Sequence, residues 1–292
     1  MVKNWIEKNA YNIFMAPTIL FILLMVMFPL LFTLYLSFTE WSMGTTAPRF
    51  IGLENYINLI RDERFINATG RTLFLAFGSV AIQLVLGTAL AVFLNRNFKG
   101  KNLVKTLFLL PMVVTPVAIG MVWLLIYEPT LGIANHLLKS IGLDPVLWLV
   151  DRRIVLYSLM LIEVWEWTPM ITLIVLAGLT AVPTDPVESA MVDGANRWQI
   201  FWKVTFPMLR PTLVIAALLR LIDALKTFDI IYSTTAGGPL FASETLNILA
   251  YTTSFSYFQM GRGSATIVLF LVVIGFASSL MIWVRRKVGI DL

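Results

Sequence analysis

Four charged side chains recur at three-residue steps in the apolar segment LRLIDALKTFDIIY, at Arg220, Asp223, Lys226 and Asp229. Residues three apart are neighbours on a helix, so opposite charges in this order can pair. A charge near the centre of a membrane span costs about 2.5–3.5 kcal/mol, so unpaired charges would be expensive there. The pattern therefore predicts one of two roles, either ion pairs that hold the segment in place or groups that contact a polar solute.

A second polar cluster lies in the apolar segment LIEVWEWTPMITL, where Glu163, Trp165, Glu166 and Trp167 are nearly consecutive. Aromatic faces stack on sugar rings and carboxylates accept hydrogen bonds from hydroxyl groups, so this combination is typical of sites for polyhydroxylated solutes. The alternative for the tryptophans is a belt at the membrane surface. Pro169 would loosen the helix and free a backbone carbonyl.

The composition places these clusters in a membrane. Of 292 residues, 58% are hydrophobic and only 13% are charged, against about a half and a quarter in a soluble domain. The chain has no cysteine and the single histidine His136, so we expect neither disulfides nor a metal site. No paired nucleophile and base is apparent, and the net charge of +5 fits orientation on a membrane better than binding to nucleic acid.

Continuous apolar runs predict an all-α membrane protein with six transmembrane helices, at 13–35, 72–94, 104–127, 154–179, 212–231 and 264–284. The first run is too long for a signal peptide. Short amphipathic helices are expected on the outer side within 50–65 and 131–143. The predicted organisation is an N-terminal part at 1–71, a core at 72–284 that includes a loop at 183–211, and a tail at 285–292.

Lysine and arginine are denser on the side that carries both predicted termini, twelve against eight. By the positive-inside rule, both termini and the loop at 183–211 face the cytoplasm. Pro183 and Pro186 precede a short helix around Glu188, and Asp193-Gly194 predicts a sharp turn into a second helix over 195–204. Pro207 and Pro211 are expected to break that helix and begin the fifth span. Such a loop could present a knob to a partner or rest on lipid headgroups.

The residue order of this loop resembles the "EAA" loop of ABC-importer permeases, E-A-A-x-x-D-G-A followed by an aromatic residue and a proline. The matching residues are Glu188, Ser189, Ala190, Asp193, Gly194, Ala195, Phe201 and Pro207, with Ser189 in place of an alanine. The segments FIGLENY (50–56), TLFLLP (106–111), WEWTPM (165–170) and FDIIYSTTAGGP (228–239) resemble the maltose-type, sugar-importing branch. The resemblance covers nearly the whole chain and implies the type I ABC-importer permease fold with a cytoplasmic coupling helix.

The resemblance also implies partners in a bacterial or archaeal cytoplasmic membrane. A second permease subunit would complete the pathway, two ATPase subunits would bind ATP and magnesium, and an extracytoplasmic binding protein would deliver a sugar to the short outer loops. By analogy, Glu188 would pair with a basic residue of the ATPase, while Trp198 and Phe201 would pack the loop against the chain's own spans. The chain has no G-x-x-x-x-G-K-[ST] segment, so we expect no ATPase activity or cofactor of its own.

Carried over by position, the resemblance implies that solute contacts come from Glu166, Trp167, Met170, Arg220, Asp223, Ala224 and Thr227. Most of these side chains differ from those of the maltose-type relative, so the resemblance implies where the solute binds and not which solute it is. An importer of an anionic sugar or glycerol phosphate, using Arg220 or Lys226, is the alternative within the family. A secondary transporter is the alternative outside it, but it would not need the docking loop.

Overall fold

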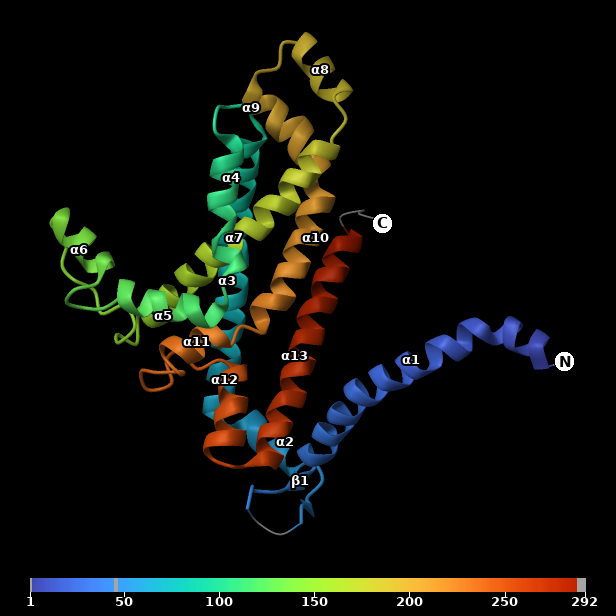
Figure 1. Ribbon diagram of the computed structural model, residues 1–292. Helices are drawn as coiled ribbons and strands as arrows, with labels where there is room; N and C mark the ends of the chain where they lie inside the picture. Colours follow the sequence, from blue (N-terminus) through green and yellow to red (C-terminus); the bar gives the residue numbers. More distant parts are fainter. Residues whose placement is uncertain (1, 45–46, 288–292) are drawn as a thin grey trace. The chain divides into compact units, whose positions relative to one another are not determined.

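The computed structural model describes residues 2–44 and 47–287, and nearly all regular structure in this part of the chain is helical (Figure 1). The chain forms two compact units. The first contains the chain up to Asp62 together with Leu249–Leu271, and the second contains Glu63–Ile248 and the chain from Val272 onward. Of the tail predicted at 285–292, the positions from 288 onward lie outside the described residues.

Within the described residues, four helices are long and apolar enough to cross a membrane. They are α1 (Val2–Ser37), α3 (Glu63–Asn95), α7 (Val155–Ala181) and α13 (Met260–Lys287). These helices correspond to the spans predicted at 13–35, 72–94, 154–179 and 264–284. The all-α prediction is therefore confirmed, and four of the six predicted spans are continuous helices.

The first unit is organised around a small hairpin, in which β1 (Thr39–Glu40) pairs antiparallel with β2 (Arg49–Phe50). The amphipathic helix expected within 50–65 is α2 (Glu54–Arg61). The chain returns through α12 (Leu246–Tyr251) and a π-helix, η3 (Thr252–Ser256), into α13. A Cβ atom at Gly261 would lie 2.0 Å from the Thr39 carbonyl oxygen, so α13 can begin against the hairpin only with glycine there.

The core of the second unit is formed by α3, α7 and α10 (Phe206–Leu225), which lie side by side in Figure 1. In α7, 67% of the most apolar stretch is buried, against 33% in α3, so α7 is the more central helix. A Cβ atom at Gly87 of α3 would lie 2.7 Å from Ile171 Cγ2 of α7. Small residues allow such close helix packing in a membrane, where van der Waals contact is a main source of association.

Two predicted spans are wrong as continuous helices. The run at 104–127 is divided into α4 (Lys101–Leu109), the 3₁₀ helix η1 (Pro111–Val113) and α5 (Pro116–Ile126). Prolines remove a backbone donor and disfavour helix in the residue before them, so Pro111 and Pro116 mark the breaks. With 11 residues, α5 is about 16 Å long, well short of a bilayer core of about 30 Å.

The run at 212–231 is divided as well, because α10 ends at Leu225 and helix resumes only in α11 (Asp229–Thr234). No proline or glycine marks this break. Instead, the Lys226 carbonyl accepts a hydrogen bond from the Asn247 side chain at 2.7 Å, a contact from a distant part of the sequence. Asp229 is therefore not on the same helix as Arg220 and Asp223, and the four-residue ladder predicted on one helix is wrong in its last member.

The remaining helices of the second unit are short. The outer amphipathic piece expected within 131–143 is α6 (Ile133–Ser140). The loop that follows α7 contains α8 (Asp185–Val192), α9 (Arg197–Ile200) and the π-helix η2 (Phe201–Thr205). In Figure 1, α8 lies beyond the end of α7, where the loop turns back toward α10.

Candidate functional site

The first feature of the candidate site is the tight turn that ends α8. Pro186 occupies the first turn of α8, where its missing N–H costs nothing, and Asp193 is the C-cap. The Gly194 N–H donates to Met191 O at 3.1 Å, and the Ala195 N–H donates to Ala190 O at 2.9 Å. This is a Schellman motif, and Gly194 has φ +79°, in the left-handed region that glycine adopts without strain. The predicted helix and glycine turn are therefore present.

The second arm of the loop begins with a capping box. The Asn196 side chain accepts from the Gln199 N–H, and the Gln199 side chain accepts from the Asn196 N–H, both at 2.9 Å. The helix then runs without a break through η2 into α10. The prediction that Pro207 and Pro211 break the helix is wrong. Pro207 lies in the first turn of α10, directly after a π-helical segment that interrupts the usual ladder of hydrogen bonds.

The side chains predicted to contact an ATPase lie mostly on the surface of this loop. Glu188, Ser189, Asp193 and Gly194 are exposed. No ion pair to Glu188 is found among the residues that the structure describes. The loop therefore leaves its polar residues available to another molecule.

The predicted packing of Trp198 against the chain's own spans is wrong. Trp198 is 71% exposed and makes an edge contact with Trp202, which is itself 46% exposed. Because α9 is only one turn long, it buries a single residue, Ile200. Phe201 is half-buried and contacts the rings of Trp202 and Phe206, so it links the loop to the start of α10.

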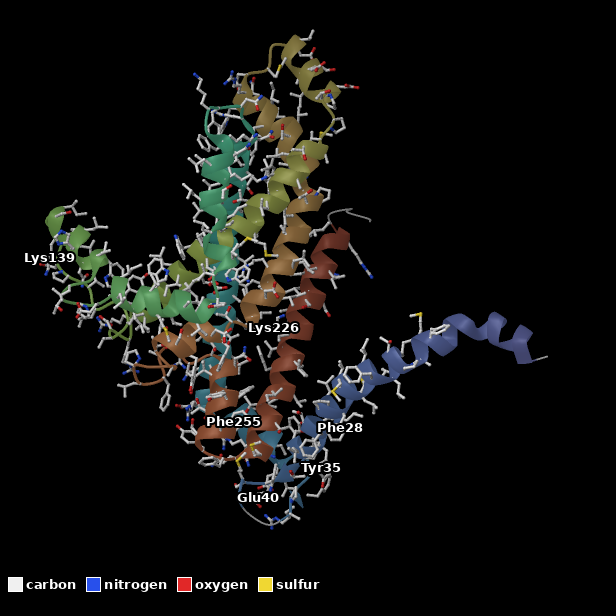
Figure 2. All side chains as sticks on the ribbon, in the orientation of Figure 1. Phe28, Tyr35, Glu40, Lys139, Lys226 and Phe255 are labelled. Carbon is white, nitrogen blue, oxygen red and sulfur yellow. The ribbon has the colours of Figure 1, made fainter. Side chains whose placement is uncertain are left out.

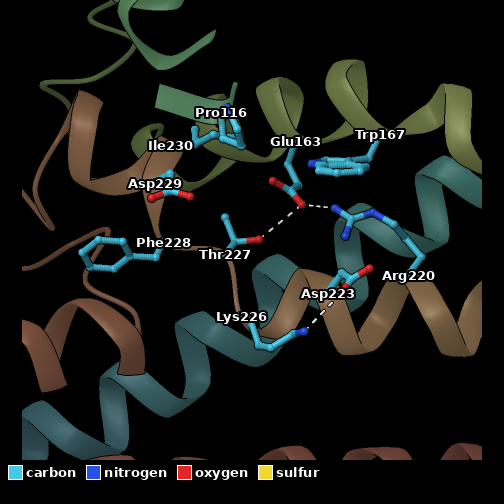
Figure 3. A pocket seen from close by; sticks show the side chains of 10 residues that line it. All are labelled: Pro116, Glu163, Trp167, Arg220, Asp223, Lys226, Thr227, Phe228, Asp229 and Ile230. Carbon is cyan, nitrogen blue, oxygen red and sulfur yellow. Dashed lines mark hydrogen bonds and ion pairs between the residues drawn. The ribbon is translucent and has the colours of Figure 1, made fainter. Parts of the chain in front are cut away.

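The second feature is a cavity of about 320 Å³ between α7, α10 and the segment that joins α10 to α11 (Figure 3). Its volume is at the low end for a small-molecule site. The lining residues are Pro116, Glu163, Trp167, Arg220, Asp223, Lys226, Thr227, Phe228, Asp229 and Ile230. Arg220, Asp223 and Lys226 come from α10 and its end, and Glu163 and Trp167 come from α7, so the two polar clusters of the sequence meet here.

One ion pair in this cavity is buried and joins two helices. Arg220 Nη2 donates to Glu163 Oε1, and both side chains are almost completely buried. Thr227 Oγ1 donates to the same carboxylate oxygen at 3.3 Å. The Arg220 guanidinium also lies 4.9 Å from the ring centroid of Trp167, in a cation–π contact. The partner of Arg220 is therefore Glu163 of α7, and not Asp223 one turn along its own helix.

A second ion pair is more exposed. Lys226 Nζ lies 3.1 Å from Asp223 Oδ1, and about half of each side chain is exposed. Figure 2 shows Lys226 at the end of α10. Part of the predicted ladder is thus structural pairing, while Asp223, Lys226 and Asp229 also present polar atoms to the cavity. The pairing role is therefore seen in the structure, and the role in solute contact stays a prediction.

The predicted solute residues divide into two groups. Trp167, Arg220, Asp223 and Thr227 line the cavity, whereas Glu166, Met170 and Ala224 do not. Ala224 is 3% exposed and packs in a hydrophobic cluster with Leu221 and Leu225, which keeps its side chain out of this cavity. Glu166 is 1% exposed, and neither of its carboxylate oxygens has a hydrogen bond of standard geometry within the described residues.

The solute residues carried over by position did not include Glu163, Phe228, Asp229 or Pro116, although each lines the cavity. Glu163 had a signal, because it lies one helical turn before Trp167 and therefore on the same face of α7. Gln83 of α3 donates to the Glu163 backbone carbonyl at 2.9 Å. No sequence pattern indicated this contact, because it joins positions 80 residues apart. Pro116 reaches the cavity only because the predicted third span is broken.

The cavity carries three carboxylates, Glu163, Asp223 and Asp229, and two cations, Arg220 and Lys226. Each cation has a carboxylate partner. The arrangement can accept and donate hydrogen bonds to hydroxyl groups, with the rings of Trp167 and Phe228 as apolar walls. No group of histidine and acidic residues that could hold a metal occurs among the described residues.

Comparisons with known proteins agree with this architecture. The profile of the binding-protein-dependent transport system inner membrane component family matches residues 83–289. A probable ABC transporter permease protein of Sinorhizobium fredii is 39% identical over 272 residues, which are 92% of this chain and 88% of that protein. A trehalose/maltose transport system permease protein of Thermococcus litoralis is 34% identical over 274 residues, which are 92% of each chain.

A solved structure has a similar fold. It is the bacterial alginate ABC transporter in complex with alginate pentasaccharide-bound periplasmic protein, with a TM-score of 0.85 and 22% identity over 98% of this chain and 97% of that chain. At this identity the likeness shows the fold alone, which is that of an ABC-importer permease. The family match covers more than half of the sequence, and the two relatives cover nearly all of it. The chain therefore belongs to the inner membrane components of binding-protein-dependent ABC transport systems.

Proposed function

We propose that this chain is one of two permease subunits of an ATP-driven importer for a neutral sugar or glycoside. A second permease subunit completes the pathway, two separate ATPase subunits bind ATP and magnesium, and an extracytoplasmic binding protein delivers the solute. The chain lies in the cytoplasmic membrane with both termini in the cytoplasm. The relative from Thermococcus litoralis is named for trehalose and maltose.

The observation that carries the proposal is the exposed helix–turn–helix at the end of α7. The Schellman turn at Gly194 and the capping box at Asn196 fix the shape of a knob whose outer face is exposed at Met191, Val192 and Trp198. An exposed apolar tip with polar flanks is typical of a protein contact. A secondary transporter needs no such contact, because an ion gradient across the membrane drives it and no separate ATPase subunit has to dock.

In the proposed mechanism, ATP binds the closed ATPase pair better than the open pair, and this difference in affinity drives the change. The ATPases move α8, and the rigid link through α9, η2 and α10 carries the movement to the cavity. Arg220 and Glu163 bridge α10 and α7 at that point. The bridge makes the cavity walls move as one body with the coupling loop.

The charges of the cavity favour a neutral solute over an anionic one. Arg220 and Lys226 are the two cations, and both are neutralised by carboxylates. Asp229 remains exposed, without an ion pair among the described residues. A phosphate or uronate would have to displace Glu163 or Asp223 from its cation and approach Asp229, whereas hydroxyl groups can bind without breaking either pair.

Reconstituted transport tests the proposal. The chain would be placed in liposomes with the permease, ATPases and binding protein of its own transport system, with ATP inside. We expect uptake of labelled neutral sugars that the binding protein binds, no uptake of glycerol phosphate or uronate oligosaccharides, and no uptake without ATP. Uptake driven by an ion gradient in the absence of ATP would contradict the assignment, and selective uptake of the anionic compounds would contradict the solute class.

A further inference from the structure

The second unit contains another cavity, of about 680 Å³, at the N-terminal end of α7. It is lined by Arg71, Val150, Asp151, Arg152, Arg153, Leu156 and Ala242. Arg71 comes from α3, and the other arginines come from the turn before α7. Three guanidinium groups therefore converge on one hollow whose only acidic side chain is Asp151.

These arginines form no ion pair within the described part of the chain, although Glu244 is near enough to Arg71 to attract its charge. Within the same residues, Nη1 of Arg71 is buried without a hydrogen-bond partner. The nearby carboxylate of Glu244 is held by Arg64 through hydrogen bonds of 2.7 and 2.6 Å. Asp151 Oδ1 accepts from the Arg153 backbone N–H at 2.8 Å, so it caps the turn.

The cluster contrasts with the other cations on the predicted outer side. Of the eight lysines and arginines there, Arg49, Arg64 and Arg262 form ion pairs with acidic residues of this chain. Three of the other five line this single cavity. The positive-inside rule disfavours such a concentration outside, so orientation in the membrane does not account for it.

The position of the cavity along α7 indicates which side of the membrane it faces. It adjoins the first turn of α7, while the coupling loop follows the last turn. Since α7 has 27 residues, the two features are about 40 Å apart along its axis. If the coupling loop meets the ATPases in the cytoplasm, this cavity faces the compartment from which the solute is delivered.

We propose that the cavity is the docking point for one or more carboxylate side chains of the solute-binding protein. This inference rests on the proposed function, which supplies a binding protein on that side. Guanidinium groups bind carboxylates through paired hydrogen bonds, so a converging set of arginines suits an acidic side chain held in a fixed orientation. Arg152 and Arg153 are exposed, so they can attract an acidic surface before contact, and Arg71 lies deeper to receive it.

The test uses the whole transporter with an Arg152→Glu/Arg153→Glu double variant. The matched control is Lys139→Glu, because Lys139 of α6 (Figure 2) does not line this cavity and is also on the predicted outer side. We expect the concentration of binding protein that gives half-maximal uptake to rise about tenfold or more in the double variant, with most of the rate recovered at saturation. The control should match the wild type. The salt dependence of half-saturation should also weaken in the double variant alone.

Equal half-saturation in the double variant and the control would overturn the proposal, provided that the wild type transports. Absence of uptake in the wild type would instead reject the proposed function. Loss of the second permease subunit from the purified double variant would overturn the proposal by assigning the arginines to a subunit interface. An effect that disappears when anionic lipid is omitted from the vesicles would also overturn it, since lipid headgroups would then be the ligand.

Discussion

The coupling loop and the solute cavity are stabilised in different ways. In the loop, the hydrogen bonds that set the shape join residues no more than five apart, as in the turn at Gly194 and the box at Asn196. In the cavity, the principal ion pair joins Arg220 and Glu163, which are 57 residues apart. The loop is thus an independent local shape, and the cavity exists only when α7 and α10 are packed. Substitutions should therefore act locally in the loop and on the whole helix core at the cavity.

The largest effect is expected from breaking the buried pair. Arg220→Met leaves Glu163 as an uncompensated buried carboxylate, and such a change costs about 3–5 kcal/mol. We expect a large loss of stability of the detergent-solubilised subunit, measured as the midpoint of thermal unfolding, together with loss of uptake.

The double variant Arg220→Met/Glu163→Gln separates stability from transport. Because it removes both charges, we expect it to recover most of the unfolding midpoint. Uptake should stay low, since the bridge between the cavity walls is still absent. If Arg220→Met alone were as stable as the wild type, the ion pair would not hold α7 and α10 together.

We expect Gly194→Val to lower stability less than Arg220→Met does, but to reduce the coupling of ATP hydrolysis to uptake strongly. A β-branched residue in the left-handed conformation costs about 1–2 kcal/mol, and a Cβ atom there has no neighbour within 4 Å in the described part of the chain. We expect the subunit to fold and insert while ATP-driven uptake falls at least tenfold, because the altered turn no longer fits the ATPase.

Gly142 provides the matched control for this prediction. It follows α6 with φ +80° in the same Schellman arrangement, also with open space around it. Gly142→Val should therefore cost similar stability and leave coupling intact. Equal uptake in the two variants would show that the turn at Gly194 has no special role.

The smallest effect is expected at the exposed ion pair of the cavity. Lys226→Gln removes a pair that is about half exposed, and such pairs contribute at most about 1 kcal/mol. We expect little change in the unfolding midpoint and a change of a few fold in the KM for the solute. A loss of stability comparable to that of Arg220→Met would contradict the distinction between the two pairs.

The contrast also explains what could be predicted from the sequence. The loop was predictable because its caps, glycine turn and exposed residues follow from consecutive positions, although Trp198 was placed on the wrong side of a one-turn helix. Four spans followed from uninterrupted apolar runs. The breaks in the other two were not predicted, since Pro111 and Pro116 were read as part of a span and the break after Leu225 depends on a contact from Asn247.

The cavity was predicted only in outline. The two polar clusters were recognised, but their alignment was not, because it depends on how α7 and α10 pack. Arg220 was expected beside Asp223 on one helix, and its observed partner Glu163 lies on another. Ala224 was carried over by position into the site, yet it is buried in a hydrophobic cluster with Leu221 and Leu225 and does not line the cavity.

One measurement tests the separation of the two regions most directly. In reconstituted vesicles, both the KM for the solute and the number of ATP molecules hydrolysed per solute imported would be determined for Trp167→Ala and Gly194→Val. We predict that Trp167→Ala changes the KM and leaves the ATP ratio unchanged, whereas Gly194→Val raises the ATP ratio and leaves the KM unchanged. The reverse pattern, or the same pattern in both variants, would contradict the account.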